Sequence, residues 1–229
     1  MMPTMSALLF VVGLAGPPVA ASSPRPFDIV DNSFLVEEAF NQEAGVFQNI
    51  VTATRSADGR VDFSFTQEWP VGGQTHQFSY TIPFAVATGV HGVGDVLLNY
   101  RLQVLGEHGR RPAFAPRVSL ILPGVTLADS DVGRGVNLVS RVVAASVVVR
   151  LRPMFHALCE AVTARHESLG ERATTVRQTA LIVSPGFRGG WNIGDRQLVI
   201  GVAAPMTLAD GSSSTGVLTY FSYELPWSR

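Results

Sequence analysis

The chain has 229 residues, of which 46% are hydrophobic and only 15% are charged, and its formal net charge is −1. This near-neutral balance gives no basic surface for nucleic acid, and the single cysteine excludes an internal disulfide. A spanning helix needs roughly 18 to 20 consecutive apolar residues. After the N-terminus, the longest candidate, Val142 to Val149, is too short, so the apolar surplus points away from a helical membrane protein.

The first residues resemble a secretory leader. An apolar run from Ala7 to Ala15 is followed by small residues that end at Ala21, before Ser22. We therefore expect residues 1–21 to be a signal peptide, although no Lys or Arg lies near their start. An uncleaved anchor helix is the alternative.

Residues 22–43 are expected to form a linker followed by a short helix. The linker is rich in Ser and Pro, and from Asp31 to Glu43 the apolar residues recur about one helical turn apart. Asp31 or Ser33 is suited to cap such a helix. We expect the helix to lie outside the barrel wall, at or in its lower mouth.

Residues 44–229 contain segments in which apolar and polar side chains alternate. Successive side chains of a strand point to opposite faces. Between Asp95 and Val104, one face therefore carries Asp95, Asn99, Arg101 and Gln103, while the other carries Val96, Leu98, Tyr100, Leu102 and Val104. A strand with one wet face and one apolar face is typical of a transmembrane β-barrel.

This period-two pattern predicts ten strands, within a range of about eight to twelve. The first, eighth and ninth alternate less regularly than the others, and the ninth contains the small residues Gly201, Ala203 and Ala204. The predicted ranges are 46–55, 60–69, 74–84, 94–105, 113–122, 135–149, 154–166, 174–190, 196–206 and 216–225.

The connections between these strands alternate in length, as an up-and-down barrel requires. Short turns are expected at 71–73, 151–153 and 191–195, and longer loops at 85–93, 123–134, 167–173 and 207–215. The predicted fold is thus an all-β, antiparallel, transmembrane up-and-down barrel with a short N-terminal helix. We expect the short turns and both termini to face the periplasm.

Charged side chains on the polar faces are the candidate functional residues. A charge that faces lipid near the midplane costs roughly 2 to 4 kcal/mol, so such residues should point into the lumen or lie near its ends. His156 and Glu160, four residues apart, lie too far apart along a strand for a direct pair, so each needs a partner from elsewhere. The candidate lumen-lining and selectivity residues are Asp95, Asn99, Arg101, Arg117, Arg141, His156 and Glu160.

Four separate parts of the chain carry a family resemblance. They are the block Asp31 to Glu43, Gly92 to Val96, Ser184 to Arg188, and Gly201 to Pro205. In combination they resemble the outer-membrane β-barrel family named for the MetA pathway of phenol degradation. The resemblance implies a location in the cell outer membrane and passage of aromatic or other small organic compounds. The segment Gly124 to Asp131 departs from the pattern expected after the fifth strand.

The function that these features favour is passive passage of small hydrophobic or aromatic compounds through a membrane barrel. The expected partners are the lipid bilayer, the outer-membrane insertion machinery during assembly, and the solute. No catalytic, metal or cofactor site is expected, because the sequence has no nucleophile elbow, phosphate loop or zinc signature.

Three alternatives remain at this stage. The first is a structural or binding barrel with a filled lumen, because barrels of this size have little free interior. The second is an outer-membrane hydrolase with rim residues drawn from His91, Asp129, Asp131, Asp210 and Ser212. The third is a soluble, lipocalin-like barrel, which would require the apolar faces to point inward.

Overall fold

The computed structural model describes residues 8–11, 29, 31–36, 41–42, 44–87, 90–105, 115–122, 141–169, 175–194, 196–209 and 211–226. The regular structure in these residues is β-sheet. Within the described ranges, no helix has both the length and the apolar character needed to cross a bilayer.

The strands follow the chain from one end to the other. They are β1 (Leu8–Val11), β2 (Val46–Ser56), β3 (Val61–Val71), β4 (His76–Ala87), β5 (Val90–Val93), β6 (Val96–Leu102), β7 (Arg117–Leu122), β8 (Arg141–Arg152), β9 (Phe155–Leu169), β10 (Thr175–Ile193), β11 (Arg196–Ala203), β12 (Met206–Ala209) and β13 (Ser212–Pro226).

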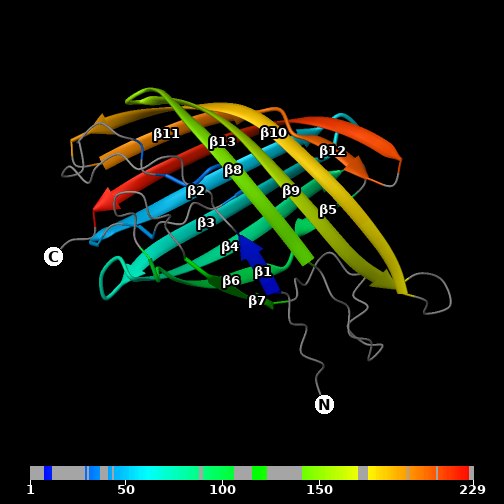
Figure 1. Cartoon of the computed structure of the whole chain (residues 1–229), viewed down its shortest axis with the longest axis horizontal. Coiled ribbons are helices and arrows are strands. Elements are labelled where there is room, and N and C mark those ends of the chain that lie inside the picture. Colours follow the sequence, from blue (N-terminus) through cyan, green and yellow to red (C-terminus); the bar gives the residue numbers. More distant parts are fainter. Residues whose placement is uncertain are drawn as a thin grey trace, which may run out of the picture.

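From β2 onward, every pair of neighbouring strands is antiparallel. The sheet order is β1-β8-β9-β10-β11-β13-β2-β3-β4-β6-β7. Two wall positions are shared by consecutive short strands, because β5 and β6 both pair with β4, while β11 and β12 both lie between β10 and β13. Each of the ten predicted strand ranges therefore coincides with one wall position. Figure 1 shows β8, β9 and β10 crossing in front of β2, β3 and β4, as the two sides of a tube do.

The apolar side chains face outward and the polar ones inward. On β6, Asn99 and Arg101 are buried, whereas Tyr100 between them is 44% exposed. On β9 and β10, Glu160 and Arg188 are buried while Phe155 and Phe187 are exposed. This arrangement is that of a transmembrane barrel. The polar-in prediction is confirmed, and the soluble barrel with inward apolar faces is wrong.

One end of the wall collects the short turns. The β3–β4, β8–β9 and β10–β11 hairpins turn there, and β13 ends beside the start of β2. Gly72, Gly73 and Gly194 have positive φ values of 65°, 114° and 66° in two of these turns, a backbone conformation that glycine adopts without strain.

Outward-facing aromatic side chains lie near this end. Trp69 stacks on Phe78 with ring centroids 6.0 Å apart, and Phe155 stacks on Phe187 at 5.9 Å. Aromatic residues at such a level form the interfacial girdles of membrane barrels.

Two of the predicted loops are wrong. The range 85–93 contains the end of β4 and all of β5, and the range 207–215 contains most of β12 and the start of β13. The sequence Asp210-Gly211 between β12 and β13 is a typical hairpin dipeptide, and Gly211 has a φ of 80°. The predicted loop 167–173 includes the last three residues of β9, while residues 170–173 and the predicted loop 123–134 lie outside the described residues.

The seam between β7 and β8 differs from the rest of the wall. Among the described residues, these two strands share no ladder; instead β1 runs parallel to β8, with Leu8 opposite Arg141, and also contacts β7. β1 lies within the predicted leader. The signal peptide over residues 1–21 stays a prediction.

The outward apolar face predicts a strong penalty for a charge placed on it. Ile200 is 46% exposed near the middle of β11. In liposomes, Ile200→Arg should lower the free energy of unfolding by about 2 to 4 kcal/mol, measured by denaturant titration. Ser213→Arg, at an exposed position of β13, should change it by less than about 0.5 kcal/mol. Equal effects would contradict a lipid-facing Ile200.

Candidate functional site

The interior of the barrel is lined by polar side chains from most of the wall. Those that are buried come from seven strands, β2, β3, β4, β6, β9, β10 and β13. The buried polar wall residues are Gln48, Glu68, Gln77, Ser79, Asn99, Arg101, His156, Glu160, Ser184, Arg188 and Ser222.

The N-terminal segment lies among these side chains. We use the name plug segment for Ile29, residues 31–36 and residues 41–42. Residues 31–36 and Ile29 are buried apart from Leu35, and they contact side chains of β2, β3, β9, β10 and β13. The segment therefore fills part of the lumen and contributes no strand to the wall.

The predicted helix over 31–43 is wrong for the residues described, since 34–36 form a bend and 31–33 and 41–42 are irregular. The reason is competition for the main chain. In a helix, the amides of Leu35 and Val36 would donate to the carbonyl oxygens of residues 31 and 32. Here those amides donate to Glu160, and those carbonyl oxygens accept from Arg188. Residues 37–40 lie outside the described part.

Two ionisable wall residues bind the main chain of the plug segment. Arg188 Nη1 donates to the carbonyl oxygens of Asp31 and Asn32, both at 2.7 Å. Glu160 Oε1 accepts from the amides of Leu35 at 2.7 Å and Val36 at 2.8 Å. Hydrogen bonds to charged groups contribute about 1.5 to 3 kcal/mol each, so these four hold the segment firmly.

Polar side chains of the segment complete this network. Asp31 Oδ1 accepts from the Tyr220 hydroxyl at 2.6 Å and from Gln48 Nε2. Asn32 Nδ2 donates to Glu68 Oε2 at 3.2 Å, and Arg101 approaches the same oxygen at 3.6 Å. The segment thus satisfies polar groups that would otherwise face an unfilled interior.

Phe34 and Ile29 pack directly on glycines of the wall, and we call the spaces that these glycines leave the glycine seats. The Phe34 ring lies over Gly186 and Gly201 and contacts Tyr220 with ring centroids 5.0 Å apart. A Cβ at Gly201 would overlap the Phe34 ring, and a Cβ at Gly190 would lie 2.7 Å from Ile29 Cγ1. Only glycine leaves room for the two side chains at these wall positions.

The seats belong to an apolar patch inside the otherwise polar lumen. Its members come from β2, β9, β11 and β13 together with the plug segment. They are Ile29, Phe34, Ile50, Leu158, Val199, Ala203, Leu218 and Tyr220. One side of the lumen is therefore apolar, and the segment packs Ile29 and Phe34 against it.

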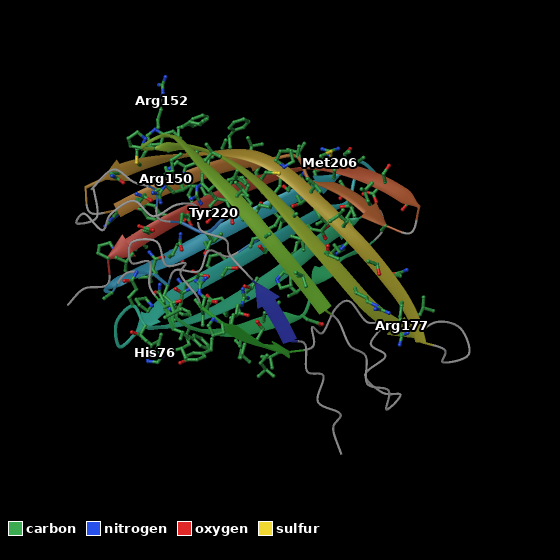
Figure 2. The ribbon with its side chains drawn as sticks, in the orientation of Figure 1. His76, Arg150, Arg152, Arg177, Met206 and Tyr220 are labelled. Atoms are coloured by element: carbon green, nitrogen blue, oxygen red, sulfur yellow. The ribbon has the colours of Figure 1, made fainter. Side chains whose placement is uncertain are left out.

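The last described residues of the segment lie toward the short-turn end. The amide of Gln42 donates to Gln77 Oε1 at 2.6 Å, and Gln42 Nε2 donates to Glu224 Oε1 at 3.1 Å. Asn41 Nδ2 donates to the carbonyl oxygen of Thr75 at 2.9 Å. In Figure 2, His76 marks this end of the wall, Arg177 marks the opposite end, and Met206 lies on the outer surface.

The structure places the sequence-predicted site residues in different parts of the barrel. Asn99, Arg101, His156 and Glu160 are buried in the lumen. Arg117 lies directly opposite Arg101 in the sheet, so these two positions carry like charges. Arg117 Nε donates to Ser119 Oγ at 3.2 Å.

The remaining two lie at strand ends. Asp95 is exposed between β5 and β6, and Arg141 begins β8. His156 and Glu160 indeed take partners from elsewhere, since Arg188 Nε lies 3.3 Å from His156 Nδ1 and the plug segment binds Glu160.

Two central residues, Glu68 and Arg188, were not among the predicted candidates. Glu68 shares the polar face of its strand, which is a signal that could have selected it. Arg188 lies in the irregular eighth predicted strand, where glycines replace the alternating pattern. Its role depends on contact with residues more than 150 positions away.

The rim residues considered for hydrolysis are not brought together by the described part of the chain. His91 is exposed on β5, Ser212 Oγ donates to the carbonyl oxygen of Ala209 at 2.7 Å, and Asp129, Asp131 and Asp210 lie outside the described residues. Over the same described ranges, no three His, Cys, Asp or Glu residues are grouped to hold a metal ion.

Comparison with known proteins gives structural neighbours only. No family model and no curated protein matches the chain. The N-terminal β-barrel domain of Pseudomonas aeruginosa OprF aligns with 8% identity and a TM-score of 0.31, over 80% of this chain and 100% of that one. A de novo designed transmembrane β-barrel aligns with 9% identity and a TM-score of 0.29, over 81% and 99%. The fold assignment rests on this chain's own strand pairing and burial.

The glycine seat predicts that Gly201 and Phe34 are energetically coupled. Gly201→Ala should destabilise the barrel by about 1 to 3 kcal/mol, because the added methyl group overlaps the Phe34 ring. In a Phe34→Ala background, the same change should cost less than about 0.5 kcal/mol. Denaturant unfolding of the four proteins of this cycle measures both values. An equal cost in both backgrounds would contradict the seat.

Proposed function

We propose that this protein is an outer-membrane β-barrel whose lumen is closed at rest by its own plug segment. The observation that carries the proposal is that Arg188 and Glu160 each make two hydrogen bonds to the segment's main chain. It favours the filled-lumen alternative over a permanently open conduit. The short-turn end faces the periplasm in this proposal, so the segment enters the lumen from that side.

A closed barrel of this kind needs no cofactor and performs no covalent chemistry. Its closure depends on a segment that contributes no strand to the wall, held by hydrogen bonds and by two apolar side chains. Such a segment can leave without breaking any ladder between wall strands. Passage therefore requires displacement of the plug segment rather than opening of the sheet.

Conductance in planar bilayers tests closure by the segment. The wild-type protein should remain mostly closed, and Arg188→Ala should open more often, because both carbonyl contacts are lost. A loss of about 2 kcal/mol shifts the closed-to-open ratio by about thirtyfold.

Arg177→Ala is the matched control, since Arg177 is an exposed arginine near the opposite end of the same strand. It should leave conductance unchanged. A wild-type protein that is constitutively open, or equal conductance of the two variants, would refute closure by the plug segment.

Passive passage of small hydrophobic or aromatic compounds is a second candidate, which the family resemblance implies. The observation in its favour is the apolar patch on one side of the lumen, which a displaced segment would expose to solute. It would offer such compounds a surface that a uniformly polar lumen lacks.

Uptake by cells tests this second candidate. Deletion of the gene should slow entry of a small aromatic compound, and the wild-type chain should restore it. Leu218→Gln, which places a polar group at a residue 1% exposed in the patch, should restore uptake of a small sugar better than that of the aromatic compound. Unchanged entry of both after deletion would contradict a transport function.

A further inference from the structure

The wall binds the plug segment as a receptor binds a peptide. Glu160 and Arg188 contact four main-chain groups of residues 31–36, two amides and two carbonyls. These contacts do not depend on side-chain identity, and they fix the position and direction of the segment. Main-chain recognition by fixed donors and acceptors is the general basis of affinity in peptide-binding sites.

Three side chains add sequence preference to this main-chain grip. Phe34 enters the seat over Gly186 and Gly201, and Ile29 enters the seat over Gly190. Asp31 accepts from Tyr220 and Gln48. The wall therefore favours a peptide that has an apolar residue, an acid two positions later, and an aromatic residue three positions after the acid.

The partners lie far from the segment in sequence. The residues that contact its main chain are 124 to 157 positions away. The wall strands themselves pair with one another without its help, as the continuous ladders from β8 to β7 through β13 and β2 show. The wall is thus the receptor and the plug segment is the ligand. The contacts between them would form equally well if the ligand were a separate peptide.

We propose that the lumen is a peptide-binding site whose resident ligand is Ile29 with residues 31–36, and that a separate peptide of this pattern binds there in trans when the resident segment is weakened. The ligand class is a short peptide with Ile, Asp and Phe at the spacing of Ile29, Asp31 and Phe34. The proposal rests on the proposed closure of the lumen and extends it, because it assigns the lumen a partner.

The test uses the full chain with a weakened resident segment, Asp31→Ala/Phe34→Ala, folded in detergent micelles. The probe is a fluorescein-labelled synthetic peptide with the sequence of residues 29–36, followed by fluorescence anisotropy. The peptide should bind this variant at least about tenfold more tightly than the wild type, where the resident segment competes. It should also lower the conductance of the variant toward the wild-type level.

Two controls establish where the peptide binds. A peptide with Ala at the position of Phe34 should bind at least about tenfold more weakly. Adding Gly201→Leu to the protein variant should abolish binding of the unchanged peptide, because the leucine side chain occupies the ring seat. Heat-modifiable mobility on a gel shows that each variant is folded, and Phe34→Ala alone serves if the double variant is not.

The outcomes separate this inference from the closure on which it rests. Equal binding of the two peptides, or binding that Gly201→Leu leaves unchanged, would overturn the peptide site, even if the variant without peptide conducts more than the wild type. Specific binding of the unchanged peptide supports the site, even if the variant conducts no more than the wild type; that conductance result would count against closure alone.

Discussion

The structure depends on one constraint, which is that a membrane barrel must bury its polar groups on the inside. Lipid satisfies no hydrogen bond, so Glu68, Arg101, Glu160 and Arg188 point inward and need partners there. Glu160 and Arg188 find theirs on the plug segment, and Glu68 finds Arg101 and Asn32. The wall and its content are therefore a single polar network.

The same constraint explains the glycines. A lumen that must hold a segment with Phe34 and Ile29 has to be hollow where these side chains lie, and Gly186, Gly190 and Gly201 provide that space. The three strands with the least regular alternation all contribute here: β2 and β11 to the apolar patch, and β10 and β11 to the glycine seats. Their irregularity reflects contact with the plug segment.

Three segments that lie far apart in the sequence meet at this place: residues 31–34, Gly186 with Arg188, and Gly201. Arg188 binds the main chain of residues 31 and 32, and Phe34 lies on Gly186 and Gly201. Segments that are far apart in the sequence thus form one set of contacts.

The sequence by itself determined the wall. Alternation depends only on neighbours within a strand, so period two was enough to locate the ten wall positions, the polar-in orientation, and the lumen residues Asn99, Arg101, His156 and Glu160. The state of the interior was decided only by the tertiary structure. The apolar spacing of residues 31–43 is compatible with a helix, and nothing local reveals that Glu160 and Arg188 take its main-chain groups. Whether polar wall residues line an open path or hold a segment depends on contacts across more than one hundred residues, which local periodicity does not encode.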